Sequence, residues 1–231
     1  MTSRVRVLTG ILLIAVPVLF NLFFFRLQAT FDYPDILRQP PEDILARFAA
    51  GGSSLIALWY GFAMVPALFI PAAVLLRRAF PGANPLLDLA TPFAVAAGLV
   101  QLLGLVRWPF LVPELAQTFL DPASSEATQA AALTVFAAFH QYAGVAVGEH
   151  LGYLFTGVWT LVIAGVMVSS RTFRPWWGWL GIISAIGILI GMLEPAGIAI
   201  AGTINAFAYI AWSIWLIGAG VFLLRARFPL G

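Results

Sequence analysis

Six apolar runs, each long enough to cross a bilayer, are the feature of this sequence that most restricts its fold. A helix needs about 20 apolar residues, at about 1.5 Å per residue, to cross roughly 30 Å of hydrocarbon. The runs occupy residues 7–25, 54–76, 86–106, 148–168, 176–193 and 198–224. In lipid each backbone amide must be bonded within its own segment, and the runs show no alternating strand pattern. The sequence therefore predicts an all-α polytopic bundle of six transmembrane helices in a single transmembrane domain.

Composition excludes several classes of protein. Of the 231 residues, 61% are hydrophobic and 10% are charged, which is incompatible with a water-soluble domain. Cysteine is absent and all 12 basic residues are arginine, so disulfides, thiolate metal sites and lysine Schiff bases are excluded. The net charge is only +2 and the arginines occur in pairs between apolar runs, so no nucleic-acid partner is expected. We expect the lipid bilayer as the main partner of the chain.

Arginine pairs predict the orientation of the bundle. With six spans, four pairs fall on one side of the membrane: Arg4 and Arg6, Arg77 and Arg78, Arg171 and Arg174, and Arg225 and Arg227. Connections on the opposite side carry seven acidic residues beside four arginines. Because short cytoplasmic loops collect positive charge, both termini are predicted to be cytoplasmic.

The first outer connection predicts an amphipathic surface helix over residues 41–50. Pro40 and Pro41 are followed by two acidic residues, which favours a helix start, and the apolar residues after them share one helical face. Asp43 and Arg47 are spaced four residues apart and are expected to form an ion pair on this helix.

Residues 128–147 are apolar enough to compete as a seventh span. A seventh crossing would move Arg174 and Arg225 to the outside and would leave no loop before the fourth span. We therefore expect an outer or re-entrant helix that continues, through a bend at Gly144 or Gly148, into the fourth span.

Polar side chains are costly inside a span and usually face the bundle interior, so their depth indicates where function lies. Counted along each span, these side chains gather in the outer half of the membrane. The predicted ligand-binding residues are Asn21, Gln101, Arg107, His140, Tyr153, Asn205 and Tyr209. Three further residues are the catalytic candidates if the protein is an enzyme: Glu149, His150 and Glu194.

Small residues predict close helix packing around the fourth span. Gly144, Gly148 and Gly152 recur at four-residue spacing, a pattern that lets another helix approach closely. The fourth span is therefore expected to be central in the bundle, and the same stripe could dock a partner membrane protein.

Two further local predictions concern helix ends. Tryptophans at the predicted membrane interfaces are expected to be lipid-facing belt anchors. They are Trp108, Trp176, Trp177 and Trp179. Asp88 is expected to cap the third span.

Two other interpretations compete for the polar residues. Arg107 could be paired with Glu149 or Glu194 in a buried ion pair that only fixes the packing. His140 and His150 suggest a metal or haem, but on a continuous helix their ten-residue separation corresponds to about 15 Å and nearly a quarter of a turn. Because the histidines and glutamates also lack regular ligand spacing, no metal site is predicted and no cofactor is identified.

Three segments of the chain resemble a family of uncharacterised bacterial integral membrane proteins, classed as a domain of unknown function. They are FDYPDILRQP at residues 31–40, GGSSLIALWYGFA at residues 51–63 and WSIWLIGAGVFLLR at residues 212–225. The resemblance covers most of the chain. It implies a helical protein of the bacterial inner membrane and carries no known active residues to transfer.

The one-sided placement of polar residues favours a binding or sensory protein whose outward-facing pocket holds a small or lipophilic ligand. The second hypothesis is an intramembrane acid/base enzyme that acts on a lipophilic substrate with Glu149, His150, Glu194 and Arg107. A transporter ranks third, because transporter sites usually lie near the midplane and no internal repeat is evident. An accessory subunit of a membrane complex is the fourth hypothesis.

Overall fold

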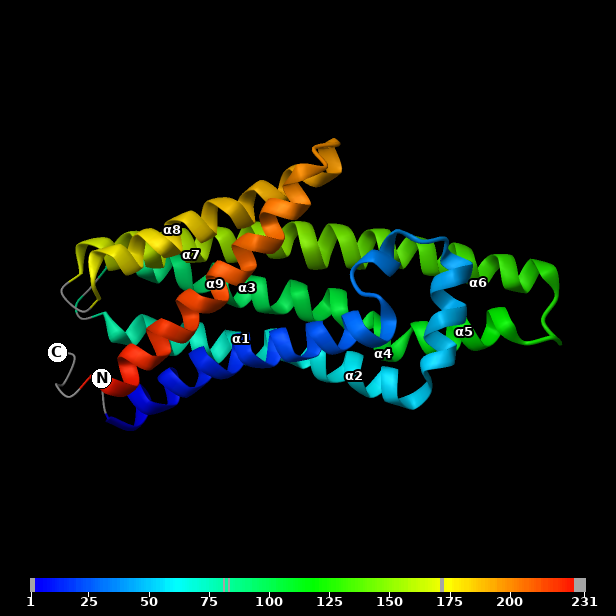
Figure 1. Ribbon diagram of the computed structural model, residues 1–231, viewed down its shortest axis with the longest axis horizontal. Coiled ribbons are helices and arrows are strands. Elements are labelled where there is room, and N and C mark those ends of the chain that lie inside the picture. Colours follow the sequence, from blue (N-terminus) through cyan, green and yellow to red (C-terminus); the bar gives the residue numbers. More distant parts are fainter. Residues whose placement is uncertain (1–2, 81, 83, 171–172, 227–231) are drawn as a thin grey trace. The chain divides into compact units, whose positions relative to one another are not determined.

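The computed structural model describes residues 3–80, 82, 84–170 and 173–226 (Figure 1). Arg171 and Arg227, two of the arginines that predict the orientation, lie outside the described residues. The part of the chain that the structure describes contains helices and no strand. The all-α prediction is therefore confirmed.

The α-helices are α1 (Ser3–Phe31), α2 (Pro41–Leu76), α3 (Pro85–Leu105), α4 (Arg107–Phe110), α5 (Val112–Leu120), α6 (Glu126–Phe139), α7 (Gly152–Ser169), α8 (Pro175–Ile190) and α9 (Ile200–Arg225). Short 3-10 helices are η1 (Asp35–Arg38), η2 (Arg77–Ala79) and η4 (Gly191–Ala196). A π-helix, η3 (His140–Leu151), joins α6 to α7.

In the part of the chain that the structure describes, six helices are long and apolar enough to cross a membrane, as the sequence predicts. They are Ser3–Phe31, Pro41–Ala79, Pro85–Leu120, Glu126–Ser169, Pro175–Ala196 and Ile200–Arg225. Residues 128–147 do not form a separate seventh span, because they belong to the continuous helix that becomes the fourth. Residues 41–50 lie in the first part of α2, which the non-helical Gly52 separates from the rest of that helix.

The residues fall into two compact units. Unit 1 consists of Met1–Val18, Pro66–Val100 and His150–Gly231. Unit 2 consists of Leu19–Val65 and Gln101–Glu149. Helices α1, α2 and α3 each pass from one unit into the other, and η3 crosses the boundary between Glu149 and His150.

In unit 1, α8 packs against both α7 and α9 (Figure 1). Glycine allows the close approach: a Cβ atom on Gly181 would lie 2.7 Å from the indole nitrogen of Trp215. Trp177 donates its indole N–H to the Trp215 carbonyl at 3.2 Å. Tight packing through small residues and hydrogen bonds replaces the hydrophobic effect as the force that holds helices together in lipid.

In unit 2, an aromatic core fills the space between helices. Trp59 of α2 and Trp108 of α4 stack with their centroids 4.4 Å apart and an interplanar angle of 11°. Phe31 packs edge-on against Trp108 at 5.4 Å, and Phe48 stacks on it at 5.7 Å. Trp108 is fully buried and is therefore not a lipid-facing anchor, because α4 turns it inward onto Trp59. Trp176 and Trp179 are 57% and 56% exposed.

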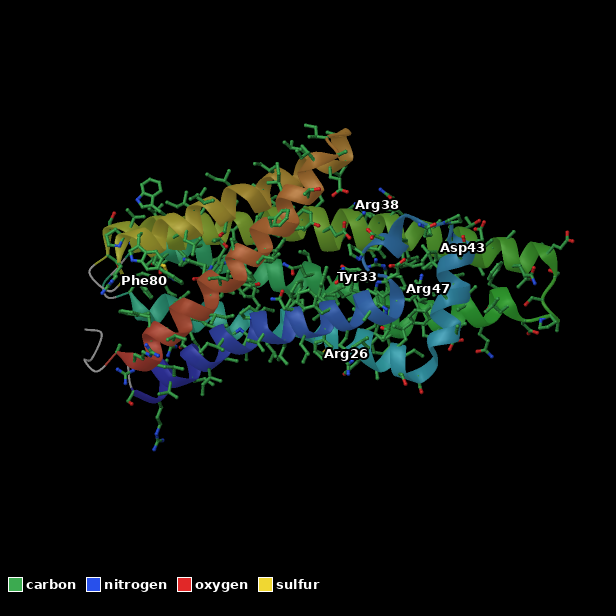
Figure 2. The ribbon with its side chains drawn as sticks, viewed as in Figure 1. Arg26, Tyr33, Arg38, Asp43, Arg47 and Phe80 are labelled. Carbon is green, nitrogen blue, oxygen red and sulfur yellow. The ribbon has the colours of Figure 1, made fainter. Side chains whose placement is uncertain are left out.

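The connection between α1 and α2 leads into this core (Figure 2). Asp32 has a φ of 60° and ends α1, and Tyr33 then packs against Trp59 at 5.3 Å. Arg47 of α2 pairs with Asp32 at 3.4 Å instead of the predicted Asp43, because the turn brings Asp32 over the first turns of α2. Both partners are about half exposed, so the pair stabilises the fold little.

The start of α3 corrects the predicted cap. Asn84 precedes the helix, and its side-chain oxygen accepts the N–H groups of Leu86 at 3.1 Å and Leu87 at 3.4 Å. Asp88 instead accepts a hydrogen bond from Arg77 at 2.8 Å. An N-cap must come directly before the first helical residue, and Asp88 already lies inside a helix that begins at Pro85.

Candidate functional site

The ten predicted site residues are divided between the two units. Unit 2 contains Asn21, Gln101, Arg107, His140 and Glu149. Unit 1 contains His150, Tyr153, Glu194, Asn205 and Tyr209. Within each unit the described contacts show which of these residues come together.

Arg107 is the most deeply buried charge in unit 2. It follows the end of α3 at Leu105 and begins α4, and only 8% of its surface is exposed. Its guanidinium donates to the carbonyl of Gly104, one turn earlier. The same group lies over the Trp108 ring, with Cζ 5.1 Å from the ring centroid. A desolvated cation over a tryptophan face is worth about 2 kcal/mol, so Trp108 is part of what holds the arginine.

Charged and polar groups surround Arg107. Glu149 and Tyr33 lie close enough to Arg107 to interact with it electrostatically. Glu149 is the acid of unit 2 that lies near Arg107, and it is one of the two partners considered from the sequence.

His140 lies beside Arg107. Its imidazole is hydrogen-bonded to the backbone of Leu37. The centroid of its ring lies 6.3 Å from that of Trp108, edge-on, and 5.5 Å from that of Phe136. In unit 2, all of which the structure describes, the side-chain atoms that are buried with no hydrogen-bond partner are Nδ1 of His140, Nε of Arg107 and Nε1 of Trp59. Buried polar atoms without partners are unusual in a folded protein.

The π-helix η3 builds the wall next to Arg107. π-Helical turns are rare and are often found at functional sites. Gly144 faces the arginine so closely that a Cβ atom there would lie 2.5 Å from Nη2 of Arg107. Gly104 approaches η3 at Gly148, where a Cβ on Gly104 would lie 2.6 Å from the Cα of Gly148. The close approach predicted for the glycine stripe is therefore present at Gly144 and Gly148. The residues that approach them, Arg107 and Gly104, belong to the same chain.

We call the group formed by Tyr33, Arg107, Trp108, His140 and Glu149 the Arg107 cluster. Sequence reasoning missed Tyr33, which lies in a connection, and assigned Trp108 to the membrane interface. The one available signal was that Trp108 directly follows the only arginine expected at membrane depth. An aromatic side chain next to a buried cation is well placed to stack against it.

In unit 1 the polar residues satisfy one another across helices. Asn205 is buried and donates to the Ile188 carbonyl at 3.0 Å. Trp212 donates its indole N–H to the hydroxyl of Thr160 at 2.8 Å, which joins α9 to α7. The ring centroids of Tyr209 and Tyr153 lie 5.9 Å apart. These contacts stabilise helix packing.

The acids and histidines of the catalytic and metal hypotheses are distributed over both units. Glu149 and His140 belong to unit 2, whereas Glu194 and His150 belong to unit 1. Glu194 lies in η4 and its carboxylate faces Gly202. Among the residues that the structure describes, no three His, Asp or Glu side chains are grouped so that they could hold a metal ion.

An open groove of about 560 Å³ lies in unit 1. It is lined by Asn84, Leu86, Leu161, Val162, Gly165, Val166, Ser169 and Ser170. None of the predicted site residues lines this groove. Along α7 it occupies the end opposite to Tyr153, so it does not correspond to the predicted outward pocket.

Comparison with known proteins places the chain in a family. A model described as Domain of unknown function (DUF4386) matches residues 8–225. The chain belongs to the DUF4386 family. This confirms the resemblance to an uncharacterised family of membrane proteins. No curated protein and no solved structure matches the chain.

Proposed function

We propose that this DUF4386 protein is a membrane-embedded ligand-binding protein and that the Arg107 cluster recognises the carboxyl group of a small amphipathic molecule. The observation that carries the proposal is the pair of buried atoms without partners, Nε of Arg107 and Nδ1 of His140. A buried polar group without a partner costs about 1–3 kcal/mol, which a ligand that supplies the missing bonds recovers.

A carboxyl group fits this pair chemically. The Nε–H of Arg107 is a donor and can bond a carboxyl oxygen. In the neutral ring of His140, the nitrogen that bonds the Leu37 backbone carries the proton, and Nδ1 is therefore an acceptor. The O–H of a carboxyl group can donate to this acceptor. Trp59, Trp108 and Phe136 are buried in the core of the unit and give the site apolar surroundings.

We propose that ligand binding at the Arg107 cluster changes the conformation of the fourth span. Gly144 lies against the guanidinium of Arg107, so a ligand that moves Arg107 also moves η3. The π-helix continues without a break into α7. A conversion between π-helical and α-helical turns would change the register of α7, which is the type of two-state element that a sensor requires.

The distribution of charged residues supports a particular orientation of the protein in the membrane. We propose a bacterial inner membrane with both termini in the cytoplasm, because Arg77, Arg78 and Arg174 flank the spans on the same side as the termini. In this orientation the ligand reaches the Arg107 cluster from the periplasm or the outer leaflet.

The experiment uses cis-parinaric acid, a fluorescent fatty acid, with its methyl ester as a matched probe that lacks the acidic head. Energy transfer from tryptophan to the probe is measured for the purified protein in nanodiscs, because Trp108 lies in the cluster and Trp59 stacks on it. We expect saturable binding of the acid and at least about tenfold weaker binding of the ester, equivalent to about 1.4 kcal/mol.

Two variants separate the cluster from general charge effects. Arg107→Met should weaken binding of the acid about tenfold or more and should leave the ester unchanged. Arg26→Met removes an exposed arginine of the same unit and should bind both probes like the wild type. Equal binding of acid and ester to the wild type would contradict the proposal.

A further inference from the structure

The exposed surface of unit 2 changes character abruptly along α1 and α2. Phe25 and Tyr60 are 58% and 48% exposed. Among residues 26–59, all of which the structure describes, no large apolar side chain is exposed. The exposed side chains in this stretch are charged, polar or small. Such a surface suits water and does not suit hydrocarbon, where an exposed charge costs at least about 2.5–3.5 kcal/mol.

The second half of unit 2 shows the same change. Phe110 is 67% exposed, and Phe139 and Tyr142 are 49% and 71% exposed. Among residues 111–138, which are likewise all described, only Leu120 and Val135 are exposed large apolar side chains. A surface this poor in exposed apolar groups is typical of a water-facing domain.

Ring contacts join two of the exposed aromatic residues to each other and to the core of the unit. Tyr60 contacts Phe110 at 6.2 Å and directly follows Trp59 in the chain. Trp59 stacks on Trp108, which contacts His140 at the start of η3.

On α1, Phe25 contacts Phe24 at 5.9 Å, and Phe24 contacts Tyr33, which itself contacts Trp59. We call the exposed set the aromatic girdle; it consists of Phe25, Tyr60, Phe110, Phe139 and Tyr142.

On the other side of the girdle the exposed side chains are aliphatic. Leu22, one turn before Phe25, is 55% exposed, and Leu103, two turns before Phe110, is 59% exposed. Helix α3 has 21 residues, which correspond to about 31 Å and match the hydrocarbon thickness. Helix α2 is interrupted by the non-helical Gly52, and the part after it, residues 53–76, is about 36 Å long, so this part is sufficient to cross the bilayer without the part before Gly52.

We propose that the aromatic girdle lies in the lipid headgroup layer and that residues 26–59 and 111–138 form a cap that projects into water. The partner of the girdle is the bilayer interface, where the tyrosine hydroxyls lie among the headgroups and the phenylalanine rings lie at the edge of the hydrocarbon. The cap has its own apolar core, which includes Phe31, Ile44, Leu45 and Phe48. It projects roughly 20 Å, the length of the 14-residue α6.

This assignment places residues 128–138 outside the hydrocarbon and excludes a re-entrant position for them. It also places the Arg107 cluster, which contains Trp108 and His140, at the level of the headgroups. The cap carries seven acidic residues and three arginines, so it belongs on the side opposite to the arginine pairs. The proposal does not depend on ligand binding, because it rests on exposure and helix length alone.

The absence of cysteine makes the test direct, because any single cysteine is the only reactive thiol. Four full-length variants are compared: Ala49→Cys and Ala127→Cys in the cap, and Leu22→Cys and Leu103→Cys below the girdle. All four positions are exposed, so each substitution should leave the fold intact. Each variant is treated with a membrane-impermeant maleimide in right-side-out and in inside-out vesicles.

Maleimide reacts with the thiolate, which does not form in hydrocarbon. We expect both cap cysteines to react from one side only, at least about tenfold faster than the cysteines below the girdle. Labelling after SDS denaturation shows that every thiol is reactive, and gel filtration in detergent shows that each variant is folded. Protection of both cap cysteines in both vesicle types, or labelling of Leu22→Cys and Leu103→Cys at the rate of the cap cysteines, would overturn the proposal.

Discussion

At the scale of single residues, Arg107 organises the chemistry of unit 2. Its buried guanidinium is held by the Gly104 carbonyl and the Trp108 ring, and Glu149 lies near it. Arginine suits this position because its planar group can stack and donate at the same time, whereas lysine carries a point charge that cannot stack. Gly144 completes the arrangement because it leaves room for the guanidinium.

The space at Gly144 is testable by adding one methyl group. Gly144→Ala would place a Cβ atom 2.5 Å from Nη2 of Arg107, so the guanidinium must shift. We expect a loss of about 1–3 kcal/mol in the free energy of unfolding, the usual cost of overpacking, together with weaker binding of cis-parinaric acid. Equilibrium unfolding in mixed detergent and SDS micelles measures the first quantity.

Gly165→Ala is the matched control, because no heavy atom lies within 4 Å of a Cβ atom at that helical position. Replacing an unconstrained helical glycine by alanine should stabilise the protein by up to about 1 kcal/mol. If Gly144→Ala behaves like Gly165→Ala in both assays, the contact between η3 and Arg107 is not part of the site.

The sequence could identify part of the Arg107 cluster at this scale. A charge in an apolar segment needs a partner, which singled out Arg107 and Glu149. The sequence could not identify Tyr33, because its contact with Trp59 depends on the turn at Asp32, where the backbone has a positive φ. The sequence also could not show which of Glu149 and Glu194 lies near Arg107. The position of a residue along its span gives its depth in the membrane but does not show which helices pack together.

At the scale of elements, two departures from regular α-helix shape unit 2. The twelve-residue η3 has π-helical turns, which carry no periodic sequence signature that distinguishes them from α-helix. A regular helix was therefore the natural expectation for residues 140–151, and only a bend near Gly144 or Gly148 could be foreseen. The second departure is in α2, where Gly52 has φ 56° and ψ −153°.

The kink at Gly52 gives an element-scale prediction. This backbone conformation is essentially restricted to glycine, so Gly52→Ala should cost about 1–3 kcal/mol although no side chain clashes with the new methyl group. Ser53→Ala changes an exposed neighbour and should alter the free energy of unfolding by less than about 0.5 kcal/mol. A Gly52→Ala variant as stable as Ser53→Ala would show that the kink is absent in the membrane.

At the scale of the whole molecule, hydropathy and length were sufficient to predict six helices, because the cost of unpaired backbone groups in lipid leaves few alternatives. They could not show that α1, α2, α3 and the α6–α7 segment each contribute to two units, since an apolar core in water and an apolar surface in lipid have the same composition. Exposure separates the two: the core residues Phe31 and Phe48 are buried, whereas Leu22 and Leu103 are exposed.

The central claim is that the Arg107 cluster holds an acidic amphipathic molecule, and the most direct measurement is mass spectrometry of what the protein retains. Wild type and Arg107→Met are purified in parallel from native membranes, and their organic extracts are compared, with Arg26→Met as the control. We predict a carboxylic acid that is enriched in the wild-type and Arg26→Met extracts and depleted in the Arg107→Met extract. Extracts with the same acidic amphiphiles in all three samples would contradict the claim.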